Sequence, residues 1–167
     1  MEIKDKVVVI TGAAQGLGKN FAMDLAKRKA RLALADINVE LLEEVRKACE
    51  QAGTETRAYE LNVAEEKAVE DFFNQVVQDF GTVDGLINNA GITRDGLIAR
   101  SKDGEIRKMS LANWQAVIDV NLTGSFLCGR EFFVKLLEQK KPGVCINISS
   151  LSRSGNMGQS NYTATKA

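Results

Sequence analysis

Tyr162 and Lys166 are the side chains whose types and spacing best suit acid–base chemistry in this sequence. Residues four apart on a helix share one face, so a helix here would bring the phenol and the ammonium together. A neighbouring cation stabilises a phenolate, which suits Tyr162 to give a proton to a carbonyl oxygen or to take one from an alcohol. Such a pair alone is more often part of a surface helix. This one follows an apolar run that ends in serines.

The absence of histidine from the 167 residues removes many other mechanisms. There can be no imidazole base, no Ser-His-Asp triad and no histidine-ligated zinc. The three cysteines, Cys49, Cys128 and Cys145, are widely separated and form no C-x-x-C pair, so we expect neither a disulfide framework nor a metal site. We interpret them as buried thiols in a reducing cytoplasm.

A glycine-rich segment near the amino terminus indicates a phosphate-binding loop. Gly12, Gly16 and Gly18 follow an apolar run directly and precede a helical pattern through Phe21 and Leu25. Small residues let the backbone approach a pyrophosphate at a helix N-terminus, where free N–H groups attract anions. The spacing G-x-x-x-G-x-G differs from the common G-x-G-x-x-G, so the glycines alone do not exclude a purely structural turn.

Asp36 ends the second apolar run, about 20 residues after the glycine loop, where an acid can accept hydrogen bonds from both ribose hydroxyls of NAD. Its carboxylate would repel a 2′-phosphate, and Gln15 offers no positive charge to hold one. We therefore expect NAD(H) to be preferred, with NADP(H) as the alternative. The competing role for Asp36 is to cap a helix that begins near Asn38. We favour the ribose role.

Strands and helices in alternation must position these residues. The apolar runs of strand length are Lys6–Thr11, Arg31–Asp36, Thr56–Asn62, Asp84–Asn88 and Val144–Ser149. Helical spacing fills the gaps, as at residues 38–52, where Val39, Leu42, Val45 and Cys49 would form a buried face. Parallel strands need crossover helices, so the pattern predicts an α/β fold, a Rossmann-like doubly wound parallel sheet with helices on both faces. We treat residues 1–167 as one domain, with Pro142 in a turn.

One polar segment, Thr93–Ser110, interrupts this alternation after the fourth strand. We expect a surface loop or a small hairpin near the carboxyl end of that strand, where open α/β sheets bind ligands. Substrate contact and a plain solvated insertion are equally open interpretations.

The composition argues against two classes of partner. The chain carries 22 basic and 22 acidic residues, so it has no surplus charge for nucleic acid or an anionic membrane. It shows no export signal and no apolar run of membrane-spanning length. We expect a cytoplasmic protein with a small-molecule or thioester substrate.

Four motifs, taken together, resemble the short-chain dehydrogenase/reductase family, and within it the bacterial 3-oxoacyl-[acyl-carrier-protein] reductase branch. They occur in order across nearly the whole chain: TGAAQGLG at Thr11–Gly18, NNAG at Asn88–Gly91, Asn121 within DVNLTG, and SS…YTATK at Ser149–Lys166. Chance occurrence of all four in this order is remote.

The resemblance implies specific residue roles. Asn121 would hold a water that links Lys166 to solvent, Ser150 would bind the substrate oxygen, Tyr162 would be the acid/base, and Lys166 would also bind the nicotinamide ribose. The residues expected to bind the cofactor are Gly12, Gln15, Gly16, Leu17, Gly18, Asp36, Asn62, Val63, Asn89, Ala90, Gly91, Tyr162 and Lys166. No metal is expected.

Two departures from the family pattern leave choices open. Many relatives place one more residue between the catalytic serine and tyrosine, so Ser149 is an alternative to Ser150, which we prefer as the second serine after the strand. Asn62-Val63 stands where many relatives have Asp-Val. The carbonyl of Asn62 can accept the same hydrogen bond from the adenine amino group.

The resemblance implies hydride transfer between a nicotinamide dinucleotide and a carbonyl or secondary alcohol, with a 3-oxoacyl thioester on an acyl carrier or CoA as the leading substrate. Dehydrogenation of a sugar, steroid or other secondary alcohol would use the same residues. A non-catalytic dinucleotide-binding module is a third interpretation. Family members continue well past residue 167, so we expect a C-terminally truncated domain without the later strands and substrate lid, and a homotetramer at full length.

Overall fold

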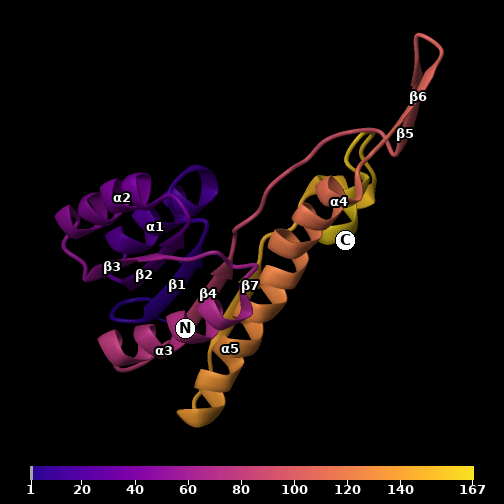
Figure 1. Cartoon of the computed structure of the whole chain (residues 1–167). Coiled ribbons are helices and arrows are strands. Elements are labelled where there is room, and N and C mark those ends of the chain that lie inside the picture. Colours follow the sequence, from indigo (N-terminus) through magenta and orange to yellow (C-terminus); the bar gives the residue numbers. More distant parts are fainter. Residues whose placement is uncertain (1) are drawn as a thin grey trace.

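The computed structural model describes residues 2–167, and its centre is a five-stranded parallel sheet (Figure 1). Its strands are β1 (Val7–Thr11), β2 (Arg31–Asp36), β3 (Thr56–Glu60), β4 (Gly85–Asn88) and β7 (Val144–Asn147). They lie in the order β3-β2-β1-β4-β7. All five predicted strands are confirmed. Four are shorter than predicted by one or two residues, because their terminal residues join the connecting turns.

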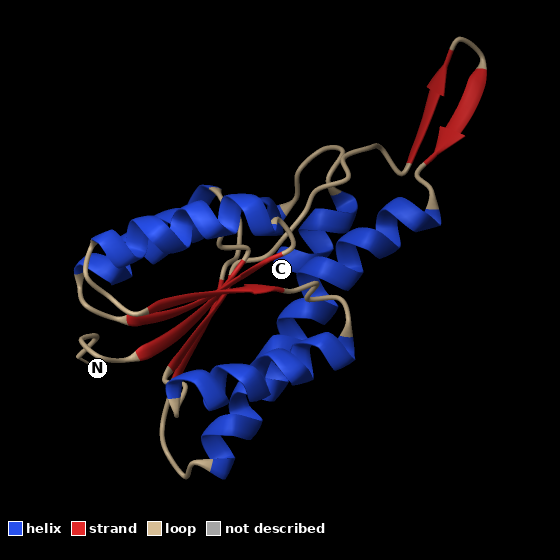
Figure 2. Cartoon of the chain, turned by 60° about the vertical axis from the view of Figure 1, so that its left-hand side comes forward, coloured by secondary structure: helices blue, strands red, loops and turns tan. Residues whose placement is uncertain are grey.

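Helices cover both faces of this sheet (Figure 2). The helical segments are α1 (Gly16–Lys27), α2 (Val39–Gln51), α3 (Glu66–Phe80), α4 (Leu111–Ile118), η1 (Asp119–Thr123), α5 (Gly124–Glu138), η2 (Leu151–Ser154) and α6 (Ser160–Lys166). The η1 segment is a π-helical turn, and η2 is a 3₁₀ turn. Backbone angles stay helical from α4 through η1 into α5, so these three form one continuous rod.

Alternate residues of the central strand enter two separate cores. Val7 and Val9 of β1 join the cluster that contains Phe73 of α3 and Phe132 of α5. Val8 and Ile10 of the same strand join the cluster on the other face, which α1 and α2 cover. This two-sided burial of β1 confirms the predicted doubly wound fold.

The chain reverses its direction of winding next to β1. β1 pairs with β2 on one side and with β4 on the other, and both pairs are parallel. The carboxyl ends of β1 and β4 therefore flank a topological switch point, which is where open α/β sheets bind ligands.

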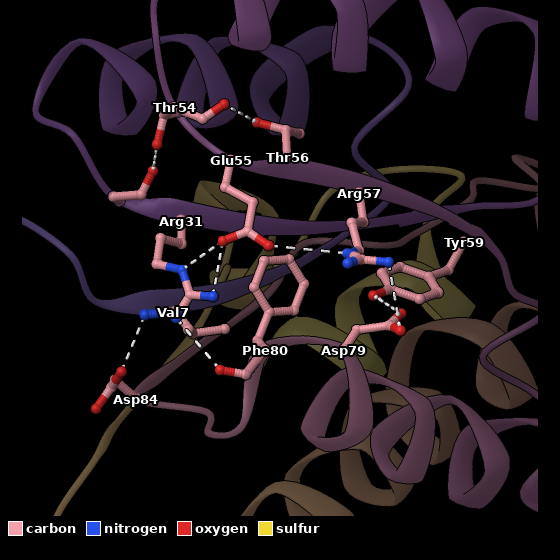
Figure 3. A network of polar contacts seen from close by, with 11 residues as sticks. Val7, Arg31, Thr54, Glu55, Thr56, Arg57, Tyr59, Asp79, Phe80 and Asp84 are labelled. Carbon is pink, nitrogen blue, oxygen red and sulfur yellow. Dashed lines mark hydrogen bonds and ion pairs between the residues drawn. The ribbon is translucent and has the colours of Figure 1, made fainter.

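Paired charged groups lie at the amino edge of the sheet (Figure 3). Arg31 Nε donates to Glu55 Oε2 at 2.7 Å. The Asp84 carboxylate accepts one hydrogen bond from the Val7 N–H at 2.9 Å and another from Lys141 Nζ at 2.8 Å. Each of these charges therefore has a partner within the protein.

Two details of the predicted core are wrong. Val39, assigned to the buried face of α2, is 47% exposed, because it occupies the first helical position beside its cap Asn38. Cys145 is only half-buried, because β7 is the edge strand of the described sheet. The other two free thiols are buried as expected, and burial raises the pKa of Cys49 to about 11 and that of Cys128 to about 12.

The polar segment after β4 forms a hairpin, which is one of the two forms predicted for it. β5 (Ala99–Lys102) pairs with β6 (Glu105–Lys108) in antiparallel register. The hairpin projects away from the main sheet, beyond α4 (Figure 1). All eight of its strand residues are exposed.

Candidate active site

The glycine loop after β1 is shaped by close backbone contacts. Gly12 has φ +64°, and a Cβ there would lie 2.8 Å from Cα of Ala90. A Cβ on Gly18 would overlap the carbonyl oxygen of Gly12. Both positions therefore require glycine, because a side chain would push the loop away from the sheet and from the helix it leads into.

The first turn of α1 has free N–H groups that face this loop. The N-cap residue is Gln15, whose side chain makes no capping hydrogen bond, and the first turn has no acidic residue. Unsatisfied N–H groups and the positive end of the helix dipole together attract an anion. The loop and helix thus form a suitable place for a phosphate group.

Asp36 connects the end of β2 to the glycine loop. One carboxylate oxygen accepts from the Ala14 N–H and the other from the Asn38 N–H, each at 3.0 Å. The side chain of Asn38, rather than that of Asp36, caps α2 by accepting from Leu41 N. The capping alternative for Asp36 is therefore wrong. A carboxylate has about four acceptor sites, so Asp36 keeps capacity for further donors.

A cavity of about 460 Å³ opens beside these groups at the carboxyl edge of the sheet. The predicted cofactor residues that line it are Gly12, Gln15, Leu17, Asp36, Asn62, Val63, Asn89, Ala90 and Gly91. Gly16 and Gly18 shape the loop without lining the cavity, and neither Tyr162 nor Lys166 lines it. The lining residues that the sequence did not single out are Ile37, Asn38, Leu61, Ile92 and Val120. Four of the five are apolar, which makes them indistinguishable from core residues in the sequence.

The side chain of Asn62 is already held within its own turn. Its Oδ1 accepts from the Ala64 N–H at 3.1 Å, and its Nδ2 donates to Glu65 Oε1 at 2.8 Å. These bonds fix the direction of the amide at the cavity wall. The carbonyl oxygen has a second lone pair with which to accept another donor.

Asn88 and Asn89 join neighbouring strands at the switch point. Asn89 Nδ2 donates to the carbonyl oxygens of Thr11, at 3.1 Å, and Gly12, at 2.9 Å. Asn88 Nδ2 donates to Asn147 Oδ1 at 2.8 Å. The two amides hold the ends of β1, β4 and β7 together beside the cavity.

Asn121 lies in the η1 turn and is 2% exposed. Its Oδ1 accepts from the Ile92 N–H at 2.8 Å, and its Nδ2 donates to Ile92 O at 3.0 Å and to Thr165 Oγ1 at 3.3 Å. The buried amide therefore has the partners that its position demands. It connects the loop after β4 to the helix that carries Tyr162 and Lys166.

Tyr162 and Lys166 both lie on α6, and Lys166 Nζ is 5.8 Å from the centre of the tyrosine ring. The ammonium donates to Ile148 O at 2.8 Å, and the residue is 9% exposed. This burial lowers the pKa of Lys166 from its usual range. The predicted proximity of the pair is confirmed. Across residues 2–167, no hydrogen bond joins the two side chains, so two of the three lysine protons are available to a ligand.

The two serines after β7 use their hydroxyl groups differently. Ser149 Oγ donates to the carbonyl oxygen of Lys166 at 2.7 Å. Ser150 Oγ accepts from the Ser152 N–H at 3.2 Å, so its own proton stays available. Within the described residues, no hydrogen bond links Ser150 to Tyr162.

A second cavity, of about 260 Å³, brings part of the predicted catalytic group together. Asn121, Ser149 and Lys166 line it, whereas Ser150 and Tyr162 do not. Within residues 2–167, no three His, Cys, Asp or Glu side chains are grouped closely enough to hold a metal ion. No helix in that range is long and apolar enough to span a membrane.

The sequence is similar to proteins of known name. Residues 6–167 match the profile of a family described as short chain dehydrogenase. The chain is 38% identical over 168 residues to 3-oxoacyl-[acyl-carrier-protein] reductase FabG of Thermotoga maritima, covering 100% of this chain and 65% of that protein. It is 38% identical over 169 residues to the protein of that name from Staphylococcus epidermidis, covering 98% and 64%. The chain thus spans slightly less than two thirds of these relatives.

Solved structures share the fold over nearly the whole chain. An NAD⁺-bound xylitol dehydrogenase aligns with a TM-score of 0.89 at 28% identity, covering 99% of this chain and 61% of that one. A metagenomic short-chain oxidoreductase in complex with NADP aligns with a TM-score of 0.88 at 32% identity, covering 99% and 72%.

Proposed function

The chain belongs to the short-chain dehydrogenase family, and from that premise we propose that its larger carboxyl-edge cavity binds a nicotinamide dinucleotide. The proposal extends to the activity of the protein, which is hydride transfer between this cofactor and a carbonyl or secondary alcohol. The observation that carries it is the cavity of about 460 Å³, which is lined by nine residues predicted as cofactor ligands. We also propose that the chain forms a single dinucleotide-binding domain.

The described residues fit such a cofactor. The glycine loop and the uncapped start of α1 suit its pyrophosphate. Asp36 has acceptor capacity for ribose hydroxyls, and the carbonyl of Asn62 can accept from the adenine amino group. Asn89, Ala90 and Gly91 line the same cavity at the ends of β1 and β4.

We propose that NAD(H) is preferred over NADP(H). The Asp36 carboxylate lines the cavity, and a 2′-phosphate beside it would be repelled. Among the cavity-lining residues there is no lysine or arginine to offset this repulsion. NADP(H) stays as the alternative, since one structural neighbour carries NAD⁺ and the other NADP.

When bound, the dinucleotide supplies or accepts the hydride. Tyr162 gives a proton to the carbonyl oxygen in the reducing direction and takes it back in the oxidising direction. The Lys166 ammonium, 5.8 Å from the tyrosine ring, stabilises the phenolate electrostatically, and its two free protons can hold the nicotinamide ribose. Asn121 braces the loop at Ile92 and, through a water, would connect Lys166 to solvent.

Ser150 is the better candidate for binding the substrate oxygen. A group that stabilises a carbonyl oxygen must donate a hydrogen bond to it. The Ser150 hydroxyl proton is available for this, whereas the Ser149 proton is used on the carbonyl of Lys166. Loss of turnover in Ser149→Ala with full turnover in Ser150→Ala would reverse this assignment.

The substrate we propose is a 3-oxoacyl thioester on an acyl carrier or CoA. Support comes from two relatives, each 38% identical, that are named 3-oxoacyl-[acyl-carrier-protein] reductases. Oxidation of a sugar alcohol is the second candidate, because the fold matches a xylitol dehydrogenase with a TM-score of 0.89.

The test is to follow NADH absorbance with acetoacetyl thioesters in one direction and with xylitol and NAD⁺ in the other. Thioester reduction that Tyr162→Phe abolishes would support the proposal. Turnover of xylitol without turnover of thioesters would overturn the substrate assignment. NADH binding with no turnover of either, unchanged by Tyr162→Phe, would indicate a non-catalytic module.

Two broader proposals concern the cellular form of the protein. We propose a homotetramer in the cytoplasm. An apolar face of α5 supports self-association, since Phe126 is 61% exposed, Phe133 is 51% exposed and Leu137 is 78% exposed. The three free thiols fit a reducing compartment. Light scattering of the full-length protein would measure the assembly.

A further inference from the structure

A positively charged cavity lies at the base of the β5–β6 hairpin, outside the proposed cofactor site. Its volume is about 330 Å³. Four cationic side chains line it, from Arg94, Arg100, Arg107 and Lys108, together with one carboxylate, from Asp95. The lining thus has an excess of positive charge in a chain with zero formal net charge, and such a surface attracts anions.

The hairpin register places two of these cations directly opposite each other. Arg100 pairs with Arg107 in the antiparallel ladder, so both side chains project from the same face. Like charges in such a cross-strand pair destabilise a hairpin. A bound anion between the two guanidinium groups would remove this repulsion.

The two nearby carboxylates, of Asp95 and Glu105, offset only part of the charge of these four cations. Glu105 Oε2 pairs with Arg107 Nη2 at 3.3 Å, and Asp95 Oδ2 accepts from Gln159 Nε2 at 2.9 Å. Considering residues 2–167, no carboxylate oxygen lies within 4.0 Å of the charged nitrogens of Arg94, Arg100 or Lys108. Within the described residues, three of the four cations at this cavity therefore have no ion-pair partner.

The wall of the cavity is bonded to the segment that carries Tyr162. Asn161, which is fully buried, donates from Nδ2 to the carbonyl oxygen of Arg94 at 3.0 Å and to that of Asn113 at 3.4 Å. The Gly96 N–H donates to Gly158 O at 2.7 Å. A ligand in this cavity would thus lie beside the proposed active site and steady the residue before Tyr162.

We propose that this cavity binds a phosphate group, at a site separate from the dinucleotide cavity. A phosphate carries more charge than a carboxylate and offers three acceptor oxygens, which matches several guanidinium and ammonium donors. The phosphate has two candidate sources. One is a phosphate-bearing thioester substrate such as a CoA ester, which rests on the proposed function. The other is a free phosphate compound.

The binding test is calorimetric titration of the NADH-saturated full-length protein with inorganic pyrophosphate, because NADH fills the glycine loop. The variant is Arg100→Glu, which creates an opposite-charge pair with Arg107 and so retains the hairpin. We expect its affinity for pyrophosphate to fall by about tenfold or more. The control is Lys47→Glu on α2, which makes the same charge change far from the cavity and should leave affinity unchanged.

Two results would overturn the site. One is the absence of pyrophosphate binding by the NADH-saturated protein. The other is equal weakening by Arg100→Glu and Lys47→Glu, which would mean that only the overall charge matters. Loss in Arg100→Glu alone would establish the site, and this readout requires no turnover.

Kinetics with two thioesters then separates the sources. For a substrate-borne phosphate, Arg100→Glu raises KM for acetoacetyl-CoA and leaves KM unchanged for the phosphate-free acetoacetyl-N-acetylcysteamine. If neither KM moves although pyrophosphate binding is lost, the site serves a free phosphate compound. If the wild-type protein turns over neither ester, the proposed reaction fails while the binding result stands.

Discussion

The two edges of the main sheet use similar residues in opposite ways. At the amino edge, the Asp84 carboxylate meets Lys141 Nζ and the Val7 N–H, and Glu55 meets Arg31. At the carboxyl edge, the partners of Asp36 among residues 2–167 are two backbone N–H groups, and the first turn of α1 has no side-chain cap. Charge is neutralised at one edge and left available at the other.

This difference separates stability from function within one sheet. Removing either partner of a paired charge destabilises the fold, because the other charge is left without a partner. Groups with spare hydrogen-bonding capacity contribute less to the free energy of folding and more to the binding of a ligand. Variants at the amino edge should therefore change the free energy of unfolding, whereas those at the carboxyl edge should change binding or turnover.

The two tyrosines provide the largest expected contrast. Tyr162→Phe should lower turnover by about 10²- to 10⁴-fold, the usual contribution of a general acid or base, with little change in the free energy of unfolding. The matched control is Tyr59→Phe, which removes a hydroxyl that donates to Asp79 Oδ2 at 2.7 Å. The control should lose stability and keep turnover. Steady-state kinetics and urea unfolding of both variants measure the contrast, and full turnover in Tyr162→Phe would break it.

Asp84→Asn should reduce stability by about 1.5–3 kcal/mol at pH 7, the range for hydrogen bonds to charged groups. Burial acts to raise the pKa of Asp84, but Lys141 and the Val7 N–H outweigh it and hold the pKa below its usual range. The folded pKa lies below the unfolded one, so the stabilisation is present above about pH 4 and is lost as the pH falls through the folded value.

Urea unfolding at pH 7 and at pH 3 tests this second prediction. The difference between Asp84→Asn and wild type should shrink at the lower pH. Asp71→Asn, on the exposed face of α3, is the control and should change little. A cofactor KM altered as strongly as stability would contradict the division between the two edges.

Asp36→Asn should change cofactor choice by about tenfold in favour of NADPH, because the substitution removes the repulsion of a 2′-phosphate. The measurement is the ratio of kcat/KM for NADH and NADPH. The amide oxygen can still accept one of the two backbone hydrogen bonds, so the loss of stability should be smaller than for Asp84→Asn. An unchanged ratio would show that Asp36 acts only on the loop.

Arg31→Lys should have the smallest effect, below about 1 kcal/mol. Lysine keeps the charge but loses the planar fork that contacts Glu55 and Phe80 O together. Thermal unfolding would detect the difference. A loss as large as that of Asp84→Asn would mean that exposed pairs contribute as much as buried ones.

The sequence predicts the sheet well, because strand and helix periodicities are strong where both faces of the sheet are buried. It also identifies nine residues of the larger cavity: the glycine loop and Asp36 stand out by residue type and position, and the family resemblance adds those at Asn62–Val63 and Asn89–Gly91. It misses Ile92 and Val120, whose apolar side chains look like core residues. The sequence also cannot show which serine has a free hydroxyl proton. That depends on the contacts of Ser149 with Lys166 O and of Ser150 with Ser152 N, which form only in the folded chain.

The π turn at Asp119–Thr123 changes the phase of the rod that contains it. One additional residue in a helix rotates everything after it by about 100°. In the structure, α4 contacts α6, whereas α5 contacts α3 and β4. One continuous helical rod therefore packs against two different parts of the fold. Removal of one residue from this turn would keep the order of the apolar side chains of α5 but rotate them away from α3 and β4, against which they now pack.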